Sequence, residues 1–372
     1  MAFLTRLRLS HFRSHKAWGI ETDGRPLALY GPNGAGKTNV LEAVSMLSPG
    51  RGLRRAQAEE LIRRPENIGW KVSGVLRSDG EEAEVVTAVA SPGQRRSVEI
   101  DGKAASQTAL GALAPMVWLT PAMDRLWMEG AAERRRFIDR AALAFEPAHG
   151  DRAIAYEKAM RERNRLLREG RADPAWLAAL EAQMARSGAA VSRARAETVR
   201  RLTAAQDGAA TAFPRAEVAI EGPAEARFAE AAKAGEDLAV VEAEVEATLT
   251  SAFASGRFAD ERAGRTLAGP HRSDLAAVYA AKGVEARLCS TGEQKALLIS
   301  LILATARALA SERAGPPILL LDEIAAHLDA DRRAALFDEI CALGAQAWMT
   351  GTGPGLFEAL GDRGQMVEIG PA

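Results

Sequence analysis

The stretch that most constrains this 372-residue chain is LALYGPNGAGKTNVLEAV, which begins at Leu27. Residues Gly31 to Thr38 match the pattern G-x-x-x-x-G-K-T, with an apolar strand-like segment before them and a segment of helical periodicity after them. Glycines let the backbone surround phosphate groups with N–H donors, and the start of the next helix adds partial positive charge. The stretch therefore predicts a nucleotide-binding phosphate loop in which Lys37 reaches the β- and γ-phosphates and Thr38 holds Mg²⁺.

A second motif, ILLLDEIAAHLD, predicts the metal and water side of the same site. Asp322 follows four apolar residues, as expected at the C-terminal end of a buried strand, and a carboxylate there can support the Mg²⁺ shell. Neighbouring residues of a strand point to opposite faces unless the strand is ending. Because the strand is expected to end here, we predict that Glu323 turns toward the nucleotide and polarises a water molecule.

The composition limits the class of protein only weakly. The chain is 47% hydrophobic and 26% charged, and its net charge of -1 does not by itself indicate a nucleic-acid partner. The two cysteines, Cys289 and Cys341, have no metal-ligand spacing and are expected to be free thiols in a reducing compartment. The N-terminus lacks the pattern of a signal peptide, and no uncharged apolar run approaches the ~20 residues of a membrane-spanning helix. We therefore expect a cytoplasmic protein with no membrane partner.

Three regions follow from the distribution of residue types, and together they predict an α/β fold with an inserted helical lobe. Residues 1–145 are mixed, with alternating segments typical of strands and an Asp101-Gly102 pair typical of a hairpin turn. Residues 146–262 are rich in Ala, Glu and Arg and are expected to be helical. Residues 263–372 return to α/β character.

The helical region contains two long amphipathic segments. The first has a clear start, with Asp173 as N-cap and Pro174 at the first helical position. An apolar stripe then runs from Leu177 to Leu202, with gaps at Gly188 and Thr198. The second segment repeats the pattern from Leu238 onward. Two such helices fit either an antiparallel helical arm or two ordinary packed helices, and the sequence leaves both open.

A third motif, CSTGEQKALLISLILATARAL, opens a strongly helical run. On its own, Ser290 followed by Glu293 is a helix capping box. The segment also resembles the S-x-G-[QE] signature of the ABC ATPases. In that superfamily the signature of one subunit closes on the nucleotide held by another, and a serine hydroxyl, a glycine N–H and a helix N-terminus form a suitable anion site.

Several segments together resemble the RecF family of DNA-repair ATPases. They are LRLSHFRSH, YGPNGAGKTNVLEAV, LWMEGAAERRRFIDR and GRTLAGPHRSDL, in this order, and they cover most of the chain outside the helical region. GPHRSDL, from Gly269 to Leu275, is the most specific. The resemblance implies an ABC-type ATPase head of mixed sheet and flanking helices with a helical second lobe. It further implies an ATP-bound homodimer and weak, DNA-stimulated ATP hydrolysis.

The same resemblance implies partners. They are double-stranded DNA, bound without sequence specificity near single-strand gaps, and RecR, with RecO nearby, in the loading of RecA. The ATPase head of another repair or nuclease complex, of Rad50 or SMC type, is the alternative, although such chains carry far longer coiled coils. A transporter subunit is disfavoured by GPHRSDL, and an inactive scaffold by the intact Lys37, Asp322 and Glu323.

The resemblance implies functional residues at the positions of this chain that match the family's motifs. The ATP-binding set is Gly31, Asn33, Gly34, Gly36, Lys37 and Thr38, with Thr38 and Asp322 on Mg²⁺ and with Glu323 and Lys37 as catalytic residues. Ser290, Gly292 and Glu293 form the signature that would act in trans, and Asp329 resembles the D-loop aspartate at the dimer seam. Arg13, in HFRSH, resembles an arginine near the nucleotide in related heads; a plain surface position is the other interpretation.

Two departures from the ABC pattern predict slow turnover. Thr350 stands where a switch histidine is usual, and WLTPAMDRL offers no glutamine for a Q-loop.

Basic runs supply candidate DNA contacts, although such runs usually cover a solvated helix face. The candidates are Arg51, Arg54, Arg55, Arg63, Arg64, Arg134, Arg135, Arg136, Arg161, Arg163 and Arg165.

Overall fold

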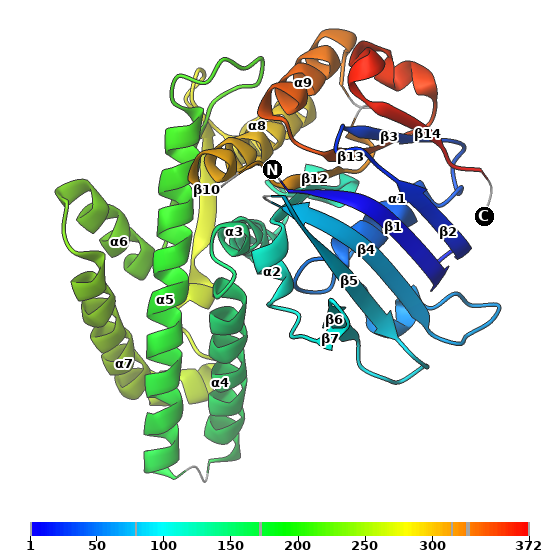
Figure 1. The fold of residues 1–372 in the computed structure, drawn as a ribbon. Coiled ribbons are helices and arrows are strands. Elements are labelled where there is room, and N and C mark those ends of the chain that lie inside the picture. Colours follow the sequence, from blue (N-terminus) through cyan, green and yellow to red (C-terminus); the bar gives the residue numbers. More distant parts are fainter. Residues whose placement is uncertain (1, 79, 171–172, 314, 325–327, 371–372) are drawn as a thin grey trace. The chain divides into compact units, whose positions relative to one another are not determined.

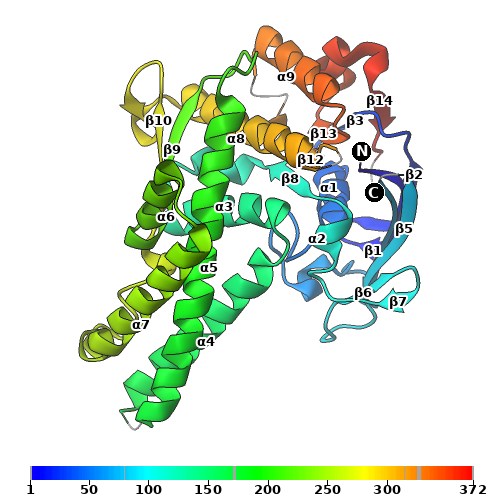
Figure 2. The same ribbon diagram turned by 60° about the vertical axis from the view of Figure 1, so that its left-hand side comes forward.

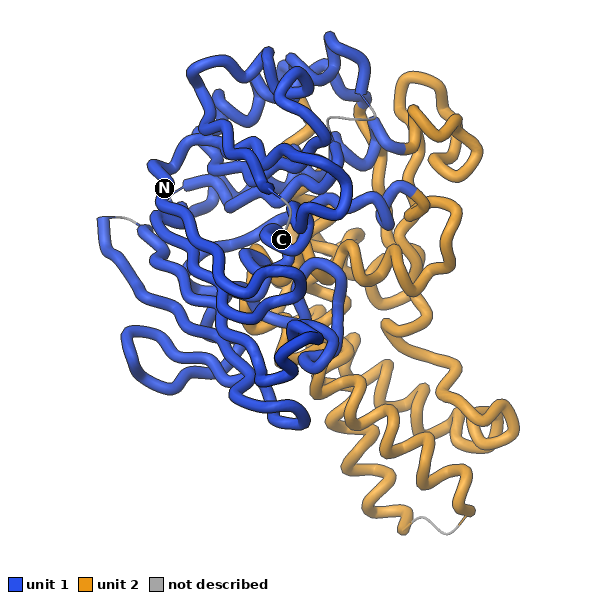
Figure 3. The backbone as a smooth tube through the Cα atoms, turned by 90° about the vertical axis from the view of Figure 1, so that its right-hand side faces the viewer, with its two compact units in different colours: residues 1–124, 208–214, 295–372 blue, residues 125–207, 215–294 orange. Residues whose placement is uncertain are grey.

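The computed structural model describes residues 2–78, 80–170, 173–313, 315–324 and 328–370 (Figure 1). The chain forms two compact units, which Figure 3 shows in different colours. Unit 1 comprises residues 1–124, 208–214 and 295–372, and unit 2 comprises residues 125–207 and 215–294. Each unit therefore combines segments that are distant in the sequence.

A five-stranded parallel sheet in unit 1 carries the phosphate loop. Its order is β14-β3-β13-β12-β8, and its strands are β3 (Leu27–Tyr30), β8 (Met116–Leu119), β12 (Ile318–Leu321), β13 (Ala347–Gly351) and β14 (Gln365–Glu368). Every residue of β12 and β13 is buried, as expected for a parallel sheet covered on both faces. Because all its strands run the same way, the segments that follow β3, β12 and β13 meet at one edge, where such sheets bind ligands.

The second sheet of unit 1 is antiparallel, in the order β2-β1-β4-β5-β6-β7. Its strands are β1 (Phe3–Phe12), β2 (His15–Glu21), β4 (Trp70–Ser78), β5 (Glu81–Val89), β6 (Ser97–Ile100) and β7 (Lys103–Ala104). The predicted hairpin is confirmed, because Asp101 and Gly102 join β6 to β7 with φ angles of 50° and 70°. Two left-handed residues in succession are what a tight type I′ turn requires.

Helix α1 (Lys37–Ser45) packs against both sheets of unit 1. Leu7 of β1, Leu29 of β3, Val44 of α1 and Trp348 of β13 have no exposed surface and belong to one apolar cluster. The other helices are α2 (Leu110–Leu113), α9 (Ala330–Leu343), most of α8 (Thr291–Glu312) and the 3₁₀ segments Ala58–Leu61, Pro121–Arg125 and Pro354–Arg363. By length and composition α8 could cross a membrane, but 83% of its apolar window is buried inside the protein, as in a core helix.

Unit 2 is built around one long helix, α5 (Pro174–Gln206). Helices α3 (Ala131–Phe145), α4 (His149–Glu169), α6 (Pro223–Ala234) and α7 (Leu238–Ala263) all contact α5, and Figures 1 and 2 show α4 and α7 running beside it. A three-stranded antiparallel sheet, β11-β10-β9, completes the unit, with β9 (Ala216–Glu221), β10 (Asp274–Tyr279) and β11 (Val284–Glu285). Short 3₁₀ turns lie at Pro270–Arg272 and Ala286–Leu288.

The start of α5 and its apolar stripe are as predicted. The Asp173 carboxylate accepts a hydrogen bond of 2.9 Å from the Ala175 N–H, with Pro174 in the first turn. The two gap positions are also buried: Thr198 has no exposed surface, and a Cβ on Gly188 would lie 3.2 Å from Tyr156 of α4. Small residues there let neighbouring helices approach closely. Several elements pack on α5, as the packed-helix interpretation predicts, and the antiparallel-arm interpretation stays a prediction.

The compact units differ from the boundaries predicted after residues 145 and 262. Helix α3, β10 and the segment through Gln294 lie in unit 2, because α3 packs on α5 and on β10, and β10 pairs with β9. Strand β9 itself falls inside residues 146–262, the region predicted to be a helical lobe with few strand-forming residues. Composition does not mark these boundaries, since they are set by which apolar and hydrogen-bonding surfaces meet.

Arg163 of α4 is the polar centre of the helical bundle. Its side chain is fully buried and donates hydrogen bonds to Glu181 of α5 at 2.9 Å, to Asp260 of α7 at 2.7 Å and to the Phe253 carbonyl at 2.7 Å. The guanidinium also donates to Thr266 at 2.9 Å. One cation thus holds three helices together, and each of its nitrogens has an acceptor.

Replacing this cation should destabilise the protein strongly. Arg163→Ala leaves two nearly buried carboxylates, Glu181 and Asp260, without their shared cation, and such a loss costs about 3–5 kcal/mol. Arg161→Ala, two positions away and exposed, is the matched control and should change stability by less than about 0.5 kcal/mol. Urea unfolding followed by circular dichroism measures both. Equal effects for the two variants would contradict this account of the bundle.

Candidate nucleotide-binding site

The phosphate loop connects β3 to α1 and depends on glycine at several positions. Gly36 has a φ of 94°, and a Cβ there would lie 2.6 Å from both His15 Nε2 and Ser14 Oγ. Gly31 has a φ of 151°, and its Cβ would lie 2.3 Å from the Ile369 carbonyl oxygen. Around Gly34, with a φ of 83°, there is open space. The loop is thus packed tightly at its base and open at its tip, where Asn33 and Gly34 are exposed.

Lys37 lies inside this loop. Its ammonium donates hydrogen bonds to the carbonyls of Gly31 at 2.8 Å and Pro32 at 2.9 Å, and the residue is 7% exposed. The positive charge is therefore held where the loop curves, close to the backbone that is predicted to surround the phosphates. Its place fits the role predicted from the sequence.

Asp322 brings the second motif to the phosphate loop. Its Oδ1 accepts hydrogen bonds from the hydroxyls of Thr38 at 2.9 Å and Thr350 at 2.8 Å. Burial raises the pKa of Asp322 above its usual value, and the two hydroxyl donors oppose that rise. A hydroxyl and a carboxylate are the oxygen ligands that Mg²⁺ prefers, and in nucleotide sites the ion takes its remaining ligands from phosphates and water. These residues fit the predicted cation.

Glu323 lies at the turn that ends the strand, as predicted. Strand β12 stops at Leu321, and Glu323 has a φ of 53°, in the left-handed region that residues with a side chain rarely adopt. Its N–H donates a 2.8 Å hydrogen bond to the Thr350 hydroxyl. Such strained residues cluster at functional sites.

The HFRSH segment braces the phosphate loop at its base. His15 Nε2 lies 3.1 Å from the Gly36 carbonyl, and burial lowers the pKa of His15 below its usual value. Ser14 accepts a 2.9 Å hydrogen bond from the Asn39 side chain. Neither His15 nor Ser14 was among the predicted site residues; the polar Asn39, directly after G-K-T, was the available signal.

Arg13 also contacts α1. It forms a bidentate ion pair with the buried Glu42, both bonds at 2.9 Å, and donates a third bond to the Glu60 carbonyl. All three guanidinium nitrogens are thereby engaged with protein groups. Arg13 is thus neither a free surface residue nor one with an uncommitted nitrogen, and its predicted contact with nucleotide stays a prediction.

The signature residues form the capping box at the start of α8, in unit 2. The Glu293 carboxylate accepts hydrogen bonds of 2.9 Å from both the N–H and the hydroxyl of Ser290, and it pairs with Lys282. The Lys282 ammonium and the Ser290 donors lower the pKa of Glu293 to about 2. A Cβ built on Gly292 would meet no described heavy atom within 4 Å apart from its chain neighbours and its own helix backbone, so the helix N-terminus is open there.

Asp329, the predicted D-loop residue, caps α9. Its carboxylate accepts a 2.8 Å hydrogen bond from the Arg332 N–H, and the residue is exposed. The cap explains why an acidic residue is favoured at this position within one chain. Its predicted place at a dimer seam stays a prediction.

The structure shows that one candidate DNA contact is wrong and that two other candidate arginines bond to residues of unit 2. Arg163 is wrong as a DNA contact, because it is buried and its nitrogens are all bonded within unit 2. Arg134 forms a bidentate pair with Asp274 at 2.7 Å, and Arg135 donates to the Ser273 carbonyl at 2.8 Å. Charge runs in a sequence do not distinguish buried cations from exposed ones.

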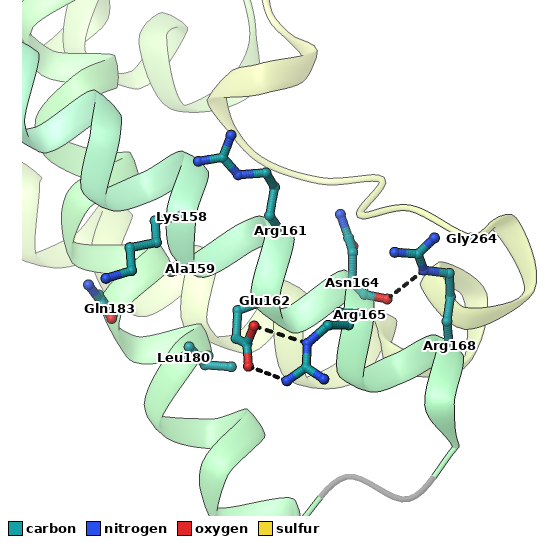
Figure 4. A pocket seen from close by; sticks show the side chains of 10 residues that line it. All are labelled: Lys158, Ala159, Arg161, Glu162, Asn164, Arg165, Arg168, Leu180, Gln183 and Gly264. Atoms are coloured by element: carbon teal, nitrogen blue, oxygen red, sulfur yellow. Dashed lines mark hydrogen bonds and ion pairs between the residues drawn. The ribbon is translucent and has the colours of Figure 1, made fainter. Parts of the chain in front are cut away.

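A groove of about 600 Å³ lies on the surface of α4 and carries several exposed cations (Figure 4). Its basic lining residues are Lys158, Arg161, Arg165 and Arg168. Arg165 is paired with Glu162 at 2.6 Å and Glu169 at 2.8 Å, whereas Lys158 and Arg161 form no ion pair with any of the residues shown lining the groove. We call this surface the α4 groove.

Replacing Gly36 should weaken nucleotide binding strongly. Gly36→Ala places a Cβ against His15 and Ser14 at a φ that disfavours any side chain. Binding of a fluorescent ATP analogue should fall by at least about tenfold, the effect of ~1.4 kcal/mol. Gly353→Ala, at an extended and open position of unit 1, is the control and should bind normally. Normal binding by Gly36→Ala would contradict this loop geometry.

The fold and the site define an ABC-type ATPase head: a phosphate loop after β3, an acidic pair after β12 and a signature-type capping box at the start of α8. The family model described as RecF/RecN/SMC N terminal domain matches residues 3–363. The chain belongs to the RecF family of DNA replication and repair proteins within that group.

Relatives agree with this membership, and solved structures share the fold. The DNA replication and repair protein RecF of Rhizobium rhizogenes is 46% identical over 99% of this chain and 96% of its own length, and that of Rhizobium meliloti is 46% identical over 99% and 97%. A solved structure of the recombination mediator protein RecF with ATP has a TM-score of 0.80 at 22% identity, covering 99% of this chain and 98% of its own. An Smc head domain from Pyrococcus furiosus has a TM-score of 0.53 at 16% identity, covering 96% and 92%.

Proposed function

We propose that this chain binds ATP with Mg²⁺, hydrolyses it weakly and more rapidly on DNA, and uses the nucleotide to control its hold on double-stranded DNA during repair. The observation that carries the proposal is the hydrogen bond between Thr38 and Asp322, which joins the phosphate loop to the acidic strand end. The family supports it, because the relatives compared above are DNA replication and repair proteins.

Each site residue has a task in this proposal. The loop N–H groups and Lys37 hold the phosphates, with Asn33 at the exposed rim. Thr38 and Asp322 hold Mg²⁺, which when bound neutralises phosphate charge. Glu323 accepts a proton from the attacking water as general base. Glu323 lies two residues after the end of β12, at the same edge of the parallel sheet as the loop that follows β3.

We further propose that two copies close on ATP, with the signature of one copy on the nucleotide of the other. Gly292 leaves the start of α8 open, and Glu293 fixes the Ser290 hydroxyl at that start. A helix N-terminus with an open glycine suits a phosphate, and the Ser290 hydroxyl can donate to that phosphate once it leaves Glu293. Asp329, exposed at the start of α9, would lie at the seam between the copies.

The partners follow from the family. We propose sequence-independent binding to duplex DNA near single-strand gaps, and cooperation with RecR, with RecO nearby, in loading RecA. A solved RecF structure of the same fold is described as part of the RecFOR pathway, in keeping with these partners. We place this activity in the cytoplasm.

Two variants separate nucleotide binding from hydrolysis. Lys37→Ala should lose both ATP binding and ATP-dependent DNA binding, because the loop loses its buried cation. Glu323→Gln should bind ATP and duplex DNA but hydrolyse ATP at least about 100-fold more slowly, the effect expected when a general base is removed. Single-turnover hydrolysis and fluorescence anisotropy with labelled duplex measure the two steps. A normal hydrolysis rate for Glu323→Gln would remove Glu323 as the base.

The α4 groove supports the DNA contact. Lys158, Arg161 and Arg168 all follow one side of α4, since they are spaced by three and seven residues, close to whole helical turns. The two acidic partners of Arg165 neutralise its charge. The charges available to phosphate are therefore those of Lys158 and Arg161, together with Arg168, which donates to the Asn164 carbonyl. Contacts of this kind bind phosphates without reading sequence.

Removing the charges of Lys158 and Arg161 should weaken DNA binding in a salt-dependent way. For Lys158→Gln with Arg161→Gln, the slope of log affinity against log salt should fall by about 0.9 for each phosphate that is no longer neutralised. The control, Lys233→Gln with Arg215→Gln, removes the same charge elsewhere in unit 2. Anisotropy titrations with ATP over a salt series measure both. Identical slopes for the two double variants would exclude the α4 groove while leaving the ATP-dependent binding of the parent intact.

A further inference from the structure

We propose that Thr350 is a positioning residue of the ATPase reaction: its hydroxyl fixes Glu323 relative to Asp322. The inference rests on the ATP site proposed above and goes beyond it, because the ABC pattern marks Thr350 only as the place of a missing switch histidine. The basis is a pair of hydrogen bonds made by one buried hydroxyl.

The sheet places Thr350 between the two motifs. Strand β13 lies between β3, which leads into the phosphate loop, and β12, which leads to Asp322. Thr350 pairs with Leu29 of β3, and Met349 before it pairs with Leu321 of β12. Thr350 therefore stands at the strand ends, next to both catalytic segments, and it has no exposed surface.

The directions of the two hydrogen bonds are fixed by chemistry. A threonine hydroxyl has one hydrogen and two lone pairs. The Glu323 N–H can only donate, so the Thr350 oxygen accepts at 2.8 Å, and the hydroxyl hydrogen is left to donate to Asp322 Oδ1, also at 2.8 Å. One oxygen atom thus links the metal-side carboxylate to the backbone of the proposed base.

This link stabilises a backbone conformation that Glu323 would not otherwise keep. Glu323 has a φ of 53°, and a residue with a side chain persists there only when surrounding contacts hold it. The N–H of Glu323 makes one such contact, and Thr350 supplies its acceptor. Without the hydroxyl, the Glu323 backbone is free to return toward an ordinary conformation, which would turn its carboxylate away from the strand edge.

Thr350 should affect hydrolysis more than ATP binding, because Asp322 keeps its hydrogen bond from Thr38 when the Thr350 hydroxyl is removed. Lys37 is held by the carbonyls of Gly31 and Pro32, and the base of the loop packs on His15 and Ser14. These contacts hold the loop without the Thr350 hydroxyl, so its effect should fall on the rate of the chemical step. A switch histidine would act on phosphate directly; Thr350 acts through Glu323.

The test compares two substitutions that differ by one hydroxyl. Thr350→Val keeps the shape of the side chain but removes the hydroxyl, and Thr350→Ser keeps the hydroxyl. We expect Thr350→Val to lower kcat for ATP hydrolysis by about tenfold or more, the effect of losing ~1.4 kcal/mol of transition-state stabilisation, with KM and fluorescent ATP binding within about twofold of the parent. Thr350→Ser should stay close to the parent in all three.

Coupling to Glu323 gives a second, independent readout. If Thr350 acts only by placing Glu323, then adding Thr350→Val to Glu323→Gln should slow hydrolysis no further. A full additional tenfold decrease in the double variant would mean that Thr350 acts by another route and would overturn the proposal. Thr350→Ala provides the same comparison if the valine variant is not folded by circular dichroism.

The outcomes separate this inference from the proposed function. Suppose that Glu323→Gln is inactive. The role of Thr350 is then overturned if Thr350→Val has a parent-like kcat, or if Thr350→Ser lowers kcat as much as Thr350→Val does. Normal hydrolysis by Glu323→Gln removes the base assignment itself, and with it the reason for Thr350 to act on hydrolysis.

Discussion

The hydrogen bond from the Thr38 hydroxyl to Asp322 joins two segments of unit 1 that are far apart in the sequence. The five-stranded sheet makes that contact possible, because its parallel strands deliver the phosphate loop and the acidic pair to one edge. The rest of the site is arranged around the hydrogen bond between Thr38 and Asp322. The HFRSH segment braces the start of α1, and Thr350 extends the same hydrogen-bonded chain to Glu323.

In unit 2, the packing explains several residues of GPHRSDL, one of the segments that carried the resemblance to RecF. Within GPHRSDL, Gly269 has a φ of 114°, and a Cβ there would lie 2.4 Å from the Tyr156 hydroxyl. That hydroxyl lies 2.6 Å from His271, and Arg195 of α5 donates a 2.6 Å hydrogen bond to the Pro270 carbonyl. The segment ties α4 and α5 to the start of β10. Arg272 of GPHRSDL is exposed, and the packing does not explain why an arginine stands there.

Local signals in the sequence were sufficient to predict several elements of the structure. The phosphate loop, the strand before Asp322, the hairpin at Asp101 and the cap at Asp173 each follow from residue types within a few positions. Features that depend on distant partners could not be predicted in this way. Arg163 is indistinguishable in sequence from its neighbour Arg161, yet one is buried among two carboxylates and the other is exposed. Likewise, β9 needs β10 to be a strand, and the role of Thr350 becomes visible only when β13 lies beside β12.

In the proposed mechanism, one copy of the chain holds half of an ATP site and a second copy supplies the signature. Mixing two inactive variants tests this directly: Lys37→Ala, which removes the loop lysine, and Ser290→Arg, which blocks the signature. A mixed dimer retains one site with both halves intact, so an equal mixture should recover about a quarter of the parent ATPase rate if copies pair at random. If the mixture stays as inactive as either variant alone, the nucleotide site is complete within one chain and closure between two copies is wrong.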